Sequence, residues 1–384
     1  MVVGLGGAVG TTMAAGIELL KQGLIGTDGL PLADAVDAGL AEYTDIVFGG
    51  WDISGEHLAN AAEEHDVLTY KQFKAAEPQL RTMKPWRAAG DAAFLANVTG
   101  EHQYSDIVHR DAVAKLRADL SGFRQNCDAV VVINLASTEK LFAEGNEIFN
   151  TPAAFEQALD DNAPEISPAM LYAYAAIAEG VPYGNFTPST AADIPALIKL
   201  AEVNGVPIAG KDGKTGQTFI KSVLAPAFKA RRLHIDGWYS TNILGNRDGL
   251  ALSDADSLAS KVKTKSTLLE DILGYDVEDH IVDIKYYRPR GDDKEAWDSI
   301  DLRGFLGRPM QIKVNFLCRD SILAAPLAIE IARCLDLAAR RGERGVQEQL
   351  SVFFKLPMTA GGKPQHDFHI QEKMLADWLA ARKN

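Results

Sequence analysis

The residues from Ser240 to Gly249, STNILGNRDG, concentrate hydrogen-bonding side chains in one short segment. They follow the apolar run IDGWY, and the lysine-rich run SKVKTKST comes shortly after them with Lys261, Lys263 and Lys265. Asn246 to Gly249 have the composition of a tight turn, in which glycine adopts positive φ without strain. Such a segment suits a surface loop, because Gly, Asn and Asp usually separate elements. Beside a group of lysines it also suits a binding site.

A glycine-rich turn near the start of the chain has the pattern that binds a dinucleotide pyrophosphate. The sequence MVVGLGGAVGTT places Gly4, Gly6, Gly7 and Gly10 between a short apolar run and an amphipathic segment, 11–20, that predicts a helix. Glycines let the backbone approach the phosphates, and the helix N-terminus directs free N–H groups at them. The preceding strand is shorter than the ~5 residues usual for strands, which suggests a truncated start.

A carboxylate for a ribose is the second part of such a site. The apolar run 46–48 predicts a strand, and Gly49, Gly50, Trp51 and Asp52 follow it. The usual pattern places an acid about 20 residues after the glycines, and Asp52 lies much further along the chain. Asp52 is therefore either a ribose ligand or the cap of a helix that begins near residue 56.

The composition describes an ordinary globular protein with an acidic surface. The 384 residues carry a formal net charge of −13, and 47% of them are hydrophobic. This length predicts two or three domains of roughly 100–200 residues. An acidic chain offers no basic stripe for nucleic acid or an anionic membrane, so the local lysines point to a small anionic ligand. Cys127, Cys318 and Cys334 lie far apart, which favours a reducing cytoplasm and gives neither a disulfide framework nor a metal-ligand set.

The order of the elements predicts the fold class. Continuous apolar strands at 128–137, 181–186 and 206–210 alternate with helices at 111–123, 166–180 and 191–205. Such alternation is typical of a doubly wound parallel sheet, at whose carboxyl edge ligands bind. Ser137, Thr138 and Glu139 end the first of these strands. The polar region 63–106, with Pro78 and Pro85, is interpreted as an excursion over the surface.

The pattern changes after residue 210. Lys211 to Thr218, KDGKTGQT, opens a helix and offers lysines, hydroxyls and backbone N–H groups to an anion, although it lacks the P-loop order. Period-two runs at 281–287 and 310–316 predict strands of a second sheet with one apolar face. Helices follow at 321–341 and, shorter, up to residue 354. The leucine and isoleucine stripe of 321–341 indicates a core or subunit contact.

Several of these motifs, taken in order, resemble those of the myo-inositol-3-phosphate synthase family. They are GLGGxxGTT, VFGGWDI, KDGKTGQT, STNILGNRDG, SKVKTKS, RPRGDDKEAWD, NFLCRDSILAAP and FFKLPM, and they run across nearly the whole chain. The resemblance implies a split NAD-binding Rossmann domain, formed by 1–218 and 324–384, with an inserted α+β catalytic and tetramerisation domain at 219–323. It also implies a homotetramer.

The resemblance further implies an intramolecular redox cyclisation. Carbon 5 of glucose 6-phosphate is oxidised, the ketone enolises, the enolate attacks the aldehyde and the ring ketone is reduced, so NAD is recycled. Enolisation and ring closure place negative charge on oxygen, which a fixed ammonium stabilises strongly in a dry pocket. Lysine also acts as acid or base when burial lowers its pKa. A lysine taken alone is usually a solvated surface charge.

The family's functional residues transfer to positions inside the matching motifs. Around the reacting carbons they are Lys261, Lys294 and Lys355, with Asp320 orienting a lysine or a substrate hydroxyl. For the substrate phosphate they are Lys265, Thr215, Gly216, Gln217 and Thr218. For NAD they are Gly4, Gly6, Gly7, Ala8, Val9, Gly10, Asp52, Ile53, Ser137, Thr138, Asp212, Asn246 and Asp248. No metal ligands are assigned.

Three departures from the family keep other functions open. Gly213 replaces a bulky aromatic, Asn134 and Leu135 replace an aromatic cofactor edge, and the segment TAGGKPQHD lacks the usual prolines. A cyclase acting on another hexose phosphate, such as fructose 6-phosphate to give a five-membered cyclitol, would use the same steps. A net NAD-dependent dehydrogenase and a non-enzymatic NAD-binding regulator are the remaining alternatives.

Overall fold

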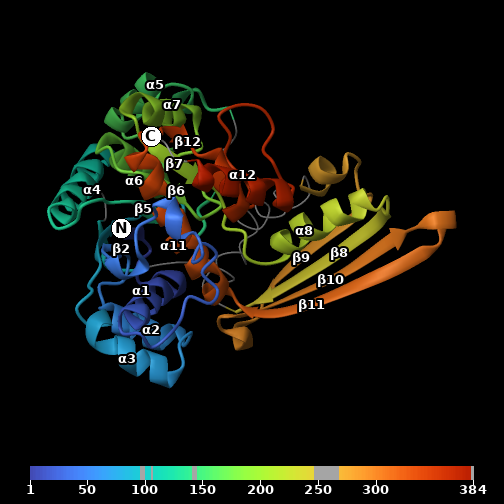
Figure 1. Ribbon diagram of the computed structural model, residues 1–384. Helices are drawn as coiled ribbons and strands as arrows, with labels where there is room; N and C mark the ends of the chain where they lie inside the picture. Colours follow the sequence, from blue (N-terminus) through green and yellow to red (C-terminus); the bar gives the residue numbers. More distant parts are fainter. Residues whose placement is uncertain (96–99, 105–106, 141–144, 246–267, 382–384) are drawn as a thin grey trace.

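The computed structural model describes residues 1–95, 100–104, 107–140, 145–245 and 268–381, which form two sheets (Figure 1). The larger sheet has the order β12-β7-β6-β5-β1-β2-β3-β4, and all its neighbouring strands are parallel. Its strands are β1 (Val2–Val3), β2 (Gly50–Asp52), β3 (Trp86–Ala89), β4 (Gln103–Tyr104), β5 (Val132–Asn134), β6 (Tyr183–Asn185), β7 (Pro207–Gly210) and β12 (Gly345–Val346). The strand order reverses between β1 and β5, which is where ligands bind in such sheets.

Helices cover both faces of this sheet, as the sequence predicts. Val2 and Val3 of β1 pack into different hydrophobic clusters, as do Val132 and Ile133 of β5, because successive side chains point to opposite faces. One face carries α4 (His109–Arg124), α5 (Pro152–Asp160), α6 (Pro168–Ala178) and α7 (Pro195–Asn204). The other carries α1 (Ala8–Lys21), α2 (Leu58–His65), α3 (Tyr70–Leu80) and α11 (Asp320–Arg340). The doubly wound parallel fold is confirmed.

The smaller sheet projects from the larger layer (Figure 1). Its order is β11-β10-β8-β9, with β8 and β9 parallel and the other pairs antiparallel. Its strands are β8 (His234–Leu244), β9 (Asp279–Tyr286), β10 (Asp293–Arg303) and β11 (Pro309–Arg319). Helix α8 (Gln217–Ala230) lies along one face, where Phe228 packs with Trp238 and Ile300. The chain then returns through α11 to the larger sheet and ends in α12 (Phe368–Ala380).

The structure corrects the sequence interpretation at the N-terminal half. Residues 46–48 are not a strand; β2 begins at Gly50. The region 63–106 is not only a surface excursion, because it supplies α3 and the two outer strands β3 and β4. Pro78 lies inside α3 near its end, where a missing N–H removes only one helical bond, and a capping box between Thr69 and Gln72 fixes the start.

Other corrections fall in the second half of the chain. Residues 240–244 are not a turn but the last part of β8, while 246–249 lie outside the described residues. Strand β10 was not predicted, and neither was α12. The predicted short helix ending at 354 is a 3₁₀-helix, Glu348–Phe353. The apolar side of β11 is incompletely covered, with Met310 and Ile312 exposed, because β11 is an edge strand and α8 packs over β8.

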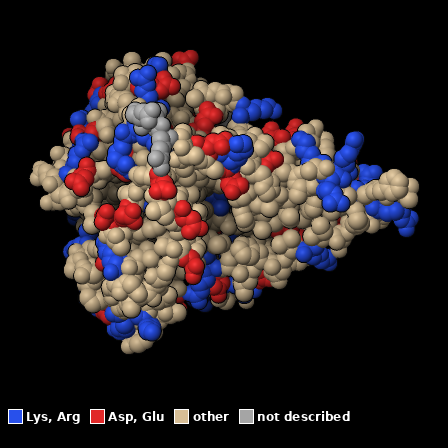
Figure 2. All heavy atoms as spheres, in the orientation of Figure 1, with Lys and Arg blue, Asp and Glu red and all other residues tan. Residues whose placement is uncertain are grey.

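The stripe on α11 is part of the core. Ile331, Leu335 and Leu337 are buried there against α1 and the strands of the larger sheet. On the face drawn in Figure 2, acidic and basic side chains are intermingled over the larger part of the molecule. Among the described residues, every helix is too short or too polar to cross a lipid bilayer.

Candidate active site

The glycine-rich turn connects β1 to α1 and brings backbone close to backbone. Gly7 is the N-cap of α1, and the Gly4 backbone has φ of 82°. A Cβ on Gly10 would lie 2.5 Å from the Leu5 carbonyl oxygen, closer than any side chain tolerates. Glycine is therefore required at Gly10, and the free N–H groups at the start of α1 are presented to the space above the sheet.

Asp52 ends β2 and points at the glycine turn. Its carboxylate accepts hydrogen bonds from the Gly6 backbone N–H (2.8 Å) and from the Ser54 N–H (2.9 Å). It does not cap a helix, because α2 begins at Leu58 and its N-cap is His57. The alternative interpretation of Asp52 is thus wrong. Its position at the carboxyl end of β2 is the one from which an acid reaches a ribose in dinucleotide-binding folds.

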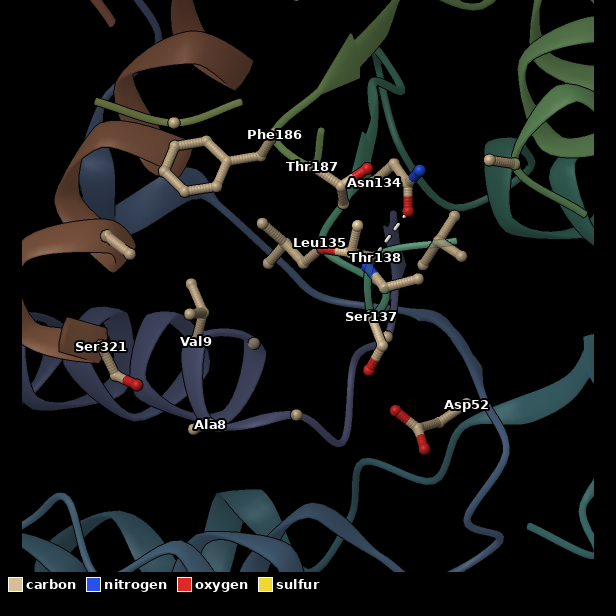
Figure 3. Close-up of a pocket in the computed structure, with 18 of the residues that line it drawn as sticks. Ala8, Val9, Asp52, Asn134, Leu135, Ser137, Thr138, Phe186, Thr187 and Ser321 are labelled. Carbon is tan, nitrogen blue, oxygen red and sulfur yellow. Dashed lines mark hydrogen bonds between the residues drawn. The ribbon is translucent and has the colours of Figure 1, made fainter. Parts of the chain in front are cut away.

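The end of β5 lies across from Asp52 and the glycine turn. Asn134 Oδ1 accepts from the Ala136 N–H at 3.1 Å, which turns the chain so that Ser137 and Thr138 follow at the carboxyl edge. Figure 3 shows the Ser137 and Asp52 side chains facing one another beside the start of α1. The structure therefore brings these residues, far apart in the chain, to the same place.

Glu139 is a buried acid that follows Ser137 and Thr138 at this edge of the sheet. One oxygen accepts from the Ala169 N–H (2.9 Å) at the start of α6, while Oε2 has no hydrogen-bond partner among the described residues. Burial raises the pKa of Glu139 to about 7, against the opposing effect of hydrogen bonds from Ser167 and Ala169. The carboxyl group therefore keeps its proton to a higher pH than an exposed glutamate does.

Glu139 predicts a pH-dependent stability. Its pKa is higher in the folded chain than in the unfolded chain, so stability falls as the pH rises from about 4.5 to about 7. The variant Glu139→Gln stays neutral, and its free energy of unfolding relative to wild type should rise by roughly 2 kcal/mol between pH 5 and pH 8. Urea denaturation at both pH values measures this, with the exposed Glu63→Gln as control. If the free energies of unfolding of the variant and of wild type differed by the same amount at pH 5 and at pH 8, the expected ionisation of Glu139 would be contradicted.

Lys355 and Asp212 form the first ion pair of the site. Lys355 Nζ lies 2.7 Å from Asp212 Oδ1, and the two side chains are 12% and 5% exposed. The backbone N–H of Lys355 also donates to the backbone carbonyl of Asp212 at 2.6 Å, and the backbone N–H of Asp212 donates to the backbone carbonyl of Thr187. These backbone bonds join the chain after β7 to the segment before α12. They hold an ammonium and a carboxylate in fixed geometry at the edge of the sheet.

Lys294 and Asp320 form the second ion pair. Lys294 Nζ lies 3.1 Å from Asp320 Oδ1, and the Thr215 hydroxyl donates to the same oxygen at 3.3 Å. A Cβ on Gly216 would lie 3.6 Å from Lys294 Nζ. The ammonium of β10 therefore lies beside the turn that opens α8, where the sequence places the substrate phosphate.

The two pairs and the glycine turn line one cavity of about 420 Å³. The predicted site residues in its wall are Gly4, Gly7, Ala8, Val9, Gly10, Asp52, Ile53, Ser137, Thr138, Asp212, Thr215, Lys294, Asp320 and Lys355. The structure thus brings together residues from seven separated parts of the sequence. Three features of the cavity fit a bound dinucleotide. The turn has no side chain at Gly10, the Asp52 carboxylate lies beside the turn, and the buried Glu139 has one oxygen without a hydrogen-bond partner among the described residues.

Some predicted residues have other positions. Gly6 does not line the cavity but donates its N–H to Asp52, and Gly216 is the N-cap of α8. Gln217 and Thr218 are buried in the first turn of α8. Four predicted residues lie outside the described part of the chain, namely Lys261, Lys265, Asn246 and Asp248.

Sequence reasoning missed Asp292 and Ser321 as site residues. Both line the cavity, and the Ser321 hydroxyl donates to Asp292 Oδ1 at 2.7 Å. Burial raises the pKa of Asp292, although hydrogen bonds from Ser321 oppose the shift. Both residues stand inside quoted motifs, next to Lys294 and Asp320, so closer attention to neighbours in those motifs would have found them.

The departure at Gly213 has a structural explanation. A Cβ on Gly213 would lie 2.0 Å from the ring of Phe186, and the Gly213 N–H donates to the Phe186 carbonyl. Phe186 lines the cavity and occupies the space that a larger residue at 213 would need (Figure 3). An aromatic ring therefore borders the cavity despite the glycine, so Gly213 alone does not enlarge the site.

A parallel doubly wound sheet with a glycine turn, an acid at the end of β2 and partly buried lysine–carboxylate pairs defines a Rossmann-type NAD-binding enzyme. The comparisons with known proteins identify which one. An NAD-binding family model described as myo-inositol-1-phosphate synthase matches residues 30–380. The chain belongs to this family, and it is an enzyme that uses NAD.

Individual relatives agree with this assignment. Inositol-3-phosphate synthase 1 of Bacteroides thetaiotaomicron is 42% identical, over 99% of this chain and 94% of that protein. Inositol-3-phosphate synthase isozyme 1 of Arabidopsis thaliana is 30% identical, over 95% and 81%. The crystal structure of inositol-3-phosphate synthase from Caenorhabditis elegans superposes with a TM-score of 0.90 at 26% identity, over 99% and 84%.

Proposed function

We propose that this enzyme converts glucose 6-phosphate to myo-inositol 3-phosphate. The observation that carries the proposal is the presence of Lys294 and Lys355, each paired with a carboxylate, in the wall of the cavity that the glycine turn also lines. Net dehydrogenation needs a hydride acceptor and one base. Ring closure needs in addition fixed positive charge where an enolate oxygen forms, and two partly buried ammonium groups can supply it.

Each pair has a separate task in this proposal. Bound NAD would accept a hydride from carbon 5 of the sugar and return it at the end. The proton of the carbon 5 hydroxyl passes to Lys355 as Lys355 gives one of its own protons to Asp212, and the transfer reverses when the ketone is reduced. Lys294, held by Asp320, stabilises the oxyanion during enolisation and ring closure. Because these groups are fixed by ion pairs before substrate binds, little reorganisation accompanies the reaction.

The substrate phosphate is assigned to the turn that opens α8. The Thr215 hydroxyl, which donates to Asp320 in this structure, would turn to the phosphate, and the first N–H groups of this 14-residue helix supply hydrogen bonds and partial positive charge. Lys294 lies beside the turn at Gly216. In this arrangement the phosphate anchors the sugar next to the reacting ammonium. Lys261 and Lys265 are proposed to complete the site from outside the described residues.

The test is a substrate panel with NAD, followed by NMR of the products. Glucose 6-phosphate should give an inositol phosphate without accumulation of NADH. Turnover of fructose 6-phosphate alone, giving a five-membered cyclitol, would replace the proposal with the related cyclase. Steady growth of NADH would indicate a net dehydrogenase, and absence of any turnover would leave a regulator.

The domain division and the assembly are also proposals. The division at 1–218, 219–323 and 324–384 follows the passage of the chain from the larger sheet to the smaller and back. A homotetramer is supported by the face of the smaller sheet opposite α8, where Tyr239, Ile281 and Leu317 are 38%, 50% and 60% exposed. Light scattering coupled to gel filtration decides the assembly. A cytoplasmic location fits the free thiols of Cys127, Cys318 and Cys334.

A further inference from the structure

The side chain of Gln217 faces the smaller sheet. Its Nε2 donates to the carbonyls of Thr241 (3.0 Å) and Trp297 (3.3 Å) and to Asp298 Oδ2 (3.4 Å), while its Oε1 accepts from Asn242. The amide is 3% exposed and uses both its donor group and its acceptor inside the protein. Only the backbone of residue 217 is therefore left for a phosphate.

Asp298 is the buried charge at the centre of this network. Its Oδ1 accepts from Trp238 Nε1 (2.8 Å) and from the Ser240 hydroxyl (2.7 Å), and the residue is 1% exposed. A buried carboxylate is costly unless donors surround it. Three side chains supply them here, and one of the three is Gln217. The carboxylate therefore ties the first turn of α8 to β8 and β10.

The same strand carries the reacting ammonium. Lys294 and Asp298 are four residues apart on β10, so their side chains emerge from the same face. Lys294 reaches the turn at Gly216, and Asp298 holds the next residue, Gln217. One strand thus fixes both the turn and the ammonium that acts beside it.

We infer that Asp298 is a positioning residue, which acts through Gln217 to hold the turn 215–218 at a fixed place relative to Lys294. The inference rests on the proposed function, which assigns the substrate phosphate to that turn. A shift of about 1 Å between a phosphate anchor and a reacting group costs on the order of 100-fold in rate. The network supplies a rigid link where such a shift would otherwise occur.

The variant Asp298→Asn tests the link selectively. The asparagine oxygen still accepts from Trp238 and Ser240, but its amide nitrogen opposes the Gln217 nitrogen, donor against donor. We expect KM for glucose 6-phosphate to rise about tenfold and kcat to fall about tenfold, with Kd for NAD unchanged within about twofold. Isothermal titration with inorganic phosphate should show the same loss of affinity as KM.

Ser240→Ala is the matched control. It removes a donor to the same carboxylate but leaves the bonds to Gln217, so it should lower the melting temperature while kcat/KM stays within about threefold. If Asp298→Asn does not fold, Gln217→Met cuts the same link from the side of the turn and should give the same kinetic losses.

Equal kinetics and phosphate affinity for the Asp298→Asn and Ser240→Ala variants would overturn the inference. The proposed function is tested separately, because wild-type protein that makes no inositol phosphate contradicts that function. Phosphate titration would still decide the role of Asp298 in that case. Weaker phosphate binding by the Asp298 variant than by the Ser240 variant supports the link, and equal binding refutes it.

Discussion

Replacing Lys294 with methionine is expected to lower kcat by at least about 1,000-fold, because the substitution removes a fixed positive charge from the oxyanion. Lys355→Met should have a similar effect through loss of a proton acceptor. Methionine keeps the length and apolar stem of the lysine, so the cavity should keep its shape. Steady-state kinetics with glucose 6-phosphate measures kcat, and calorimetry with NAD shows whether the cofactor site survives.

The control for these lysines is Lys199→Met. Lys199 lies on α7, away from the cavity, with its side chain 62% exposed and paired with Glu202. Its loss should change kcat by less than about twofold, since an exposed charge contributes little. If Lys294→Met or Lys355→Met lost less than about tenfold, the assignment of that lysine to the reaction would be wrong.

Gly10→Ala is expected to raise Kd for NAD by roughly 30-fold or more. The added Cβ would lie 2.5 Å from the Leu5 carbonyl oxygen, so the glycine turn must move away from the position that suits the pyrophosphate. Fluorescence titration or calorimetry with NAD measures this. The expected loss is in cofactor affinity first, because α1 itself tolerates alanine well.

Gly16→Ala, in the same helix, provides the comparison. A Cβ there meets nothing within 4 Å, so this variant should bind NAD like wild type. It should also be more stable by about 0.5–1 kcal/mol, since alanine loses less entropy than glycine in a helix. Equal NAD affinity of the two alanine variants would show that clearance at Gly10 does not govern cofactor binding.

The sequence predicted the central strands of the larger sheet, β1, β5, β6 and β7, because their signals are local. Buried parallel strands such as 206–210 are continuously apolar, and helices such as 195–204 end in glycine, with Gly205 at φ 71°. The same reasoning failed for β10, whose sequence DKEAWDSIDLR mixes charges with apolar residues. Such a strand is defined by its neighbours β8 and β11, and pairing across the chain leaves no local pattern.

In the candidate site, too, features with a local sequence pattern could be predicted and features that depend on the fold could not. Glycines and an acid at the end of a strand indicate a cofactor site, while Lys294 and Lys355 were assigned to it only through the resemblance to the family. The partners of those lysines could not be read from spacing, because Asp212 and Lys355 are 143 residues apart and meet only through the fold. Glu139 escaped assignment for a related reason, since its raised pKa arises from burial that sequence does not display.

In the proposed reaction, one hydride leaves and re-enters the same sugar while the ring closes between two partly buried ammonium groups. Glucose 6-phosphate carrying deuterium at carbon 5, incubated with the enzyme and NAD and followed by NMR and NADH absorbance, tests it most directly. The proposed reaction gives an inositol phosphate that retains the deuterium, with no NADH accumulating. NADH that grows in proportion to the sugar consumed, or a cyclic product without deuterium, would contradict it.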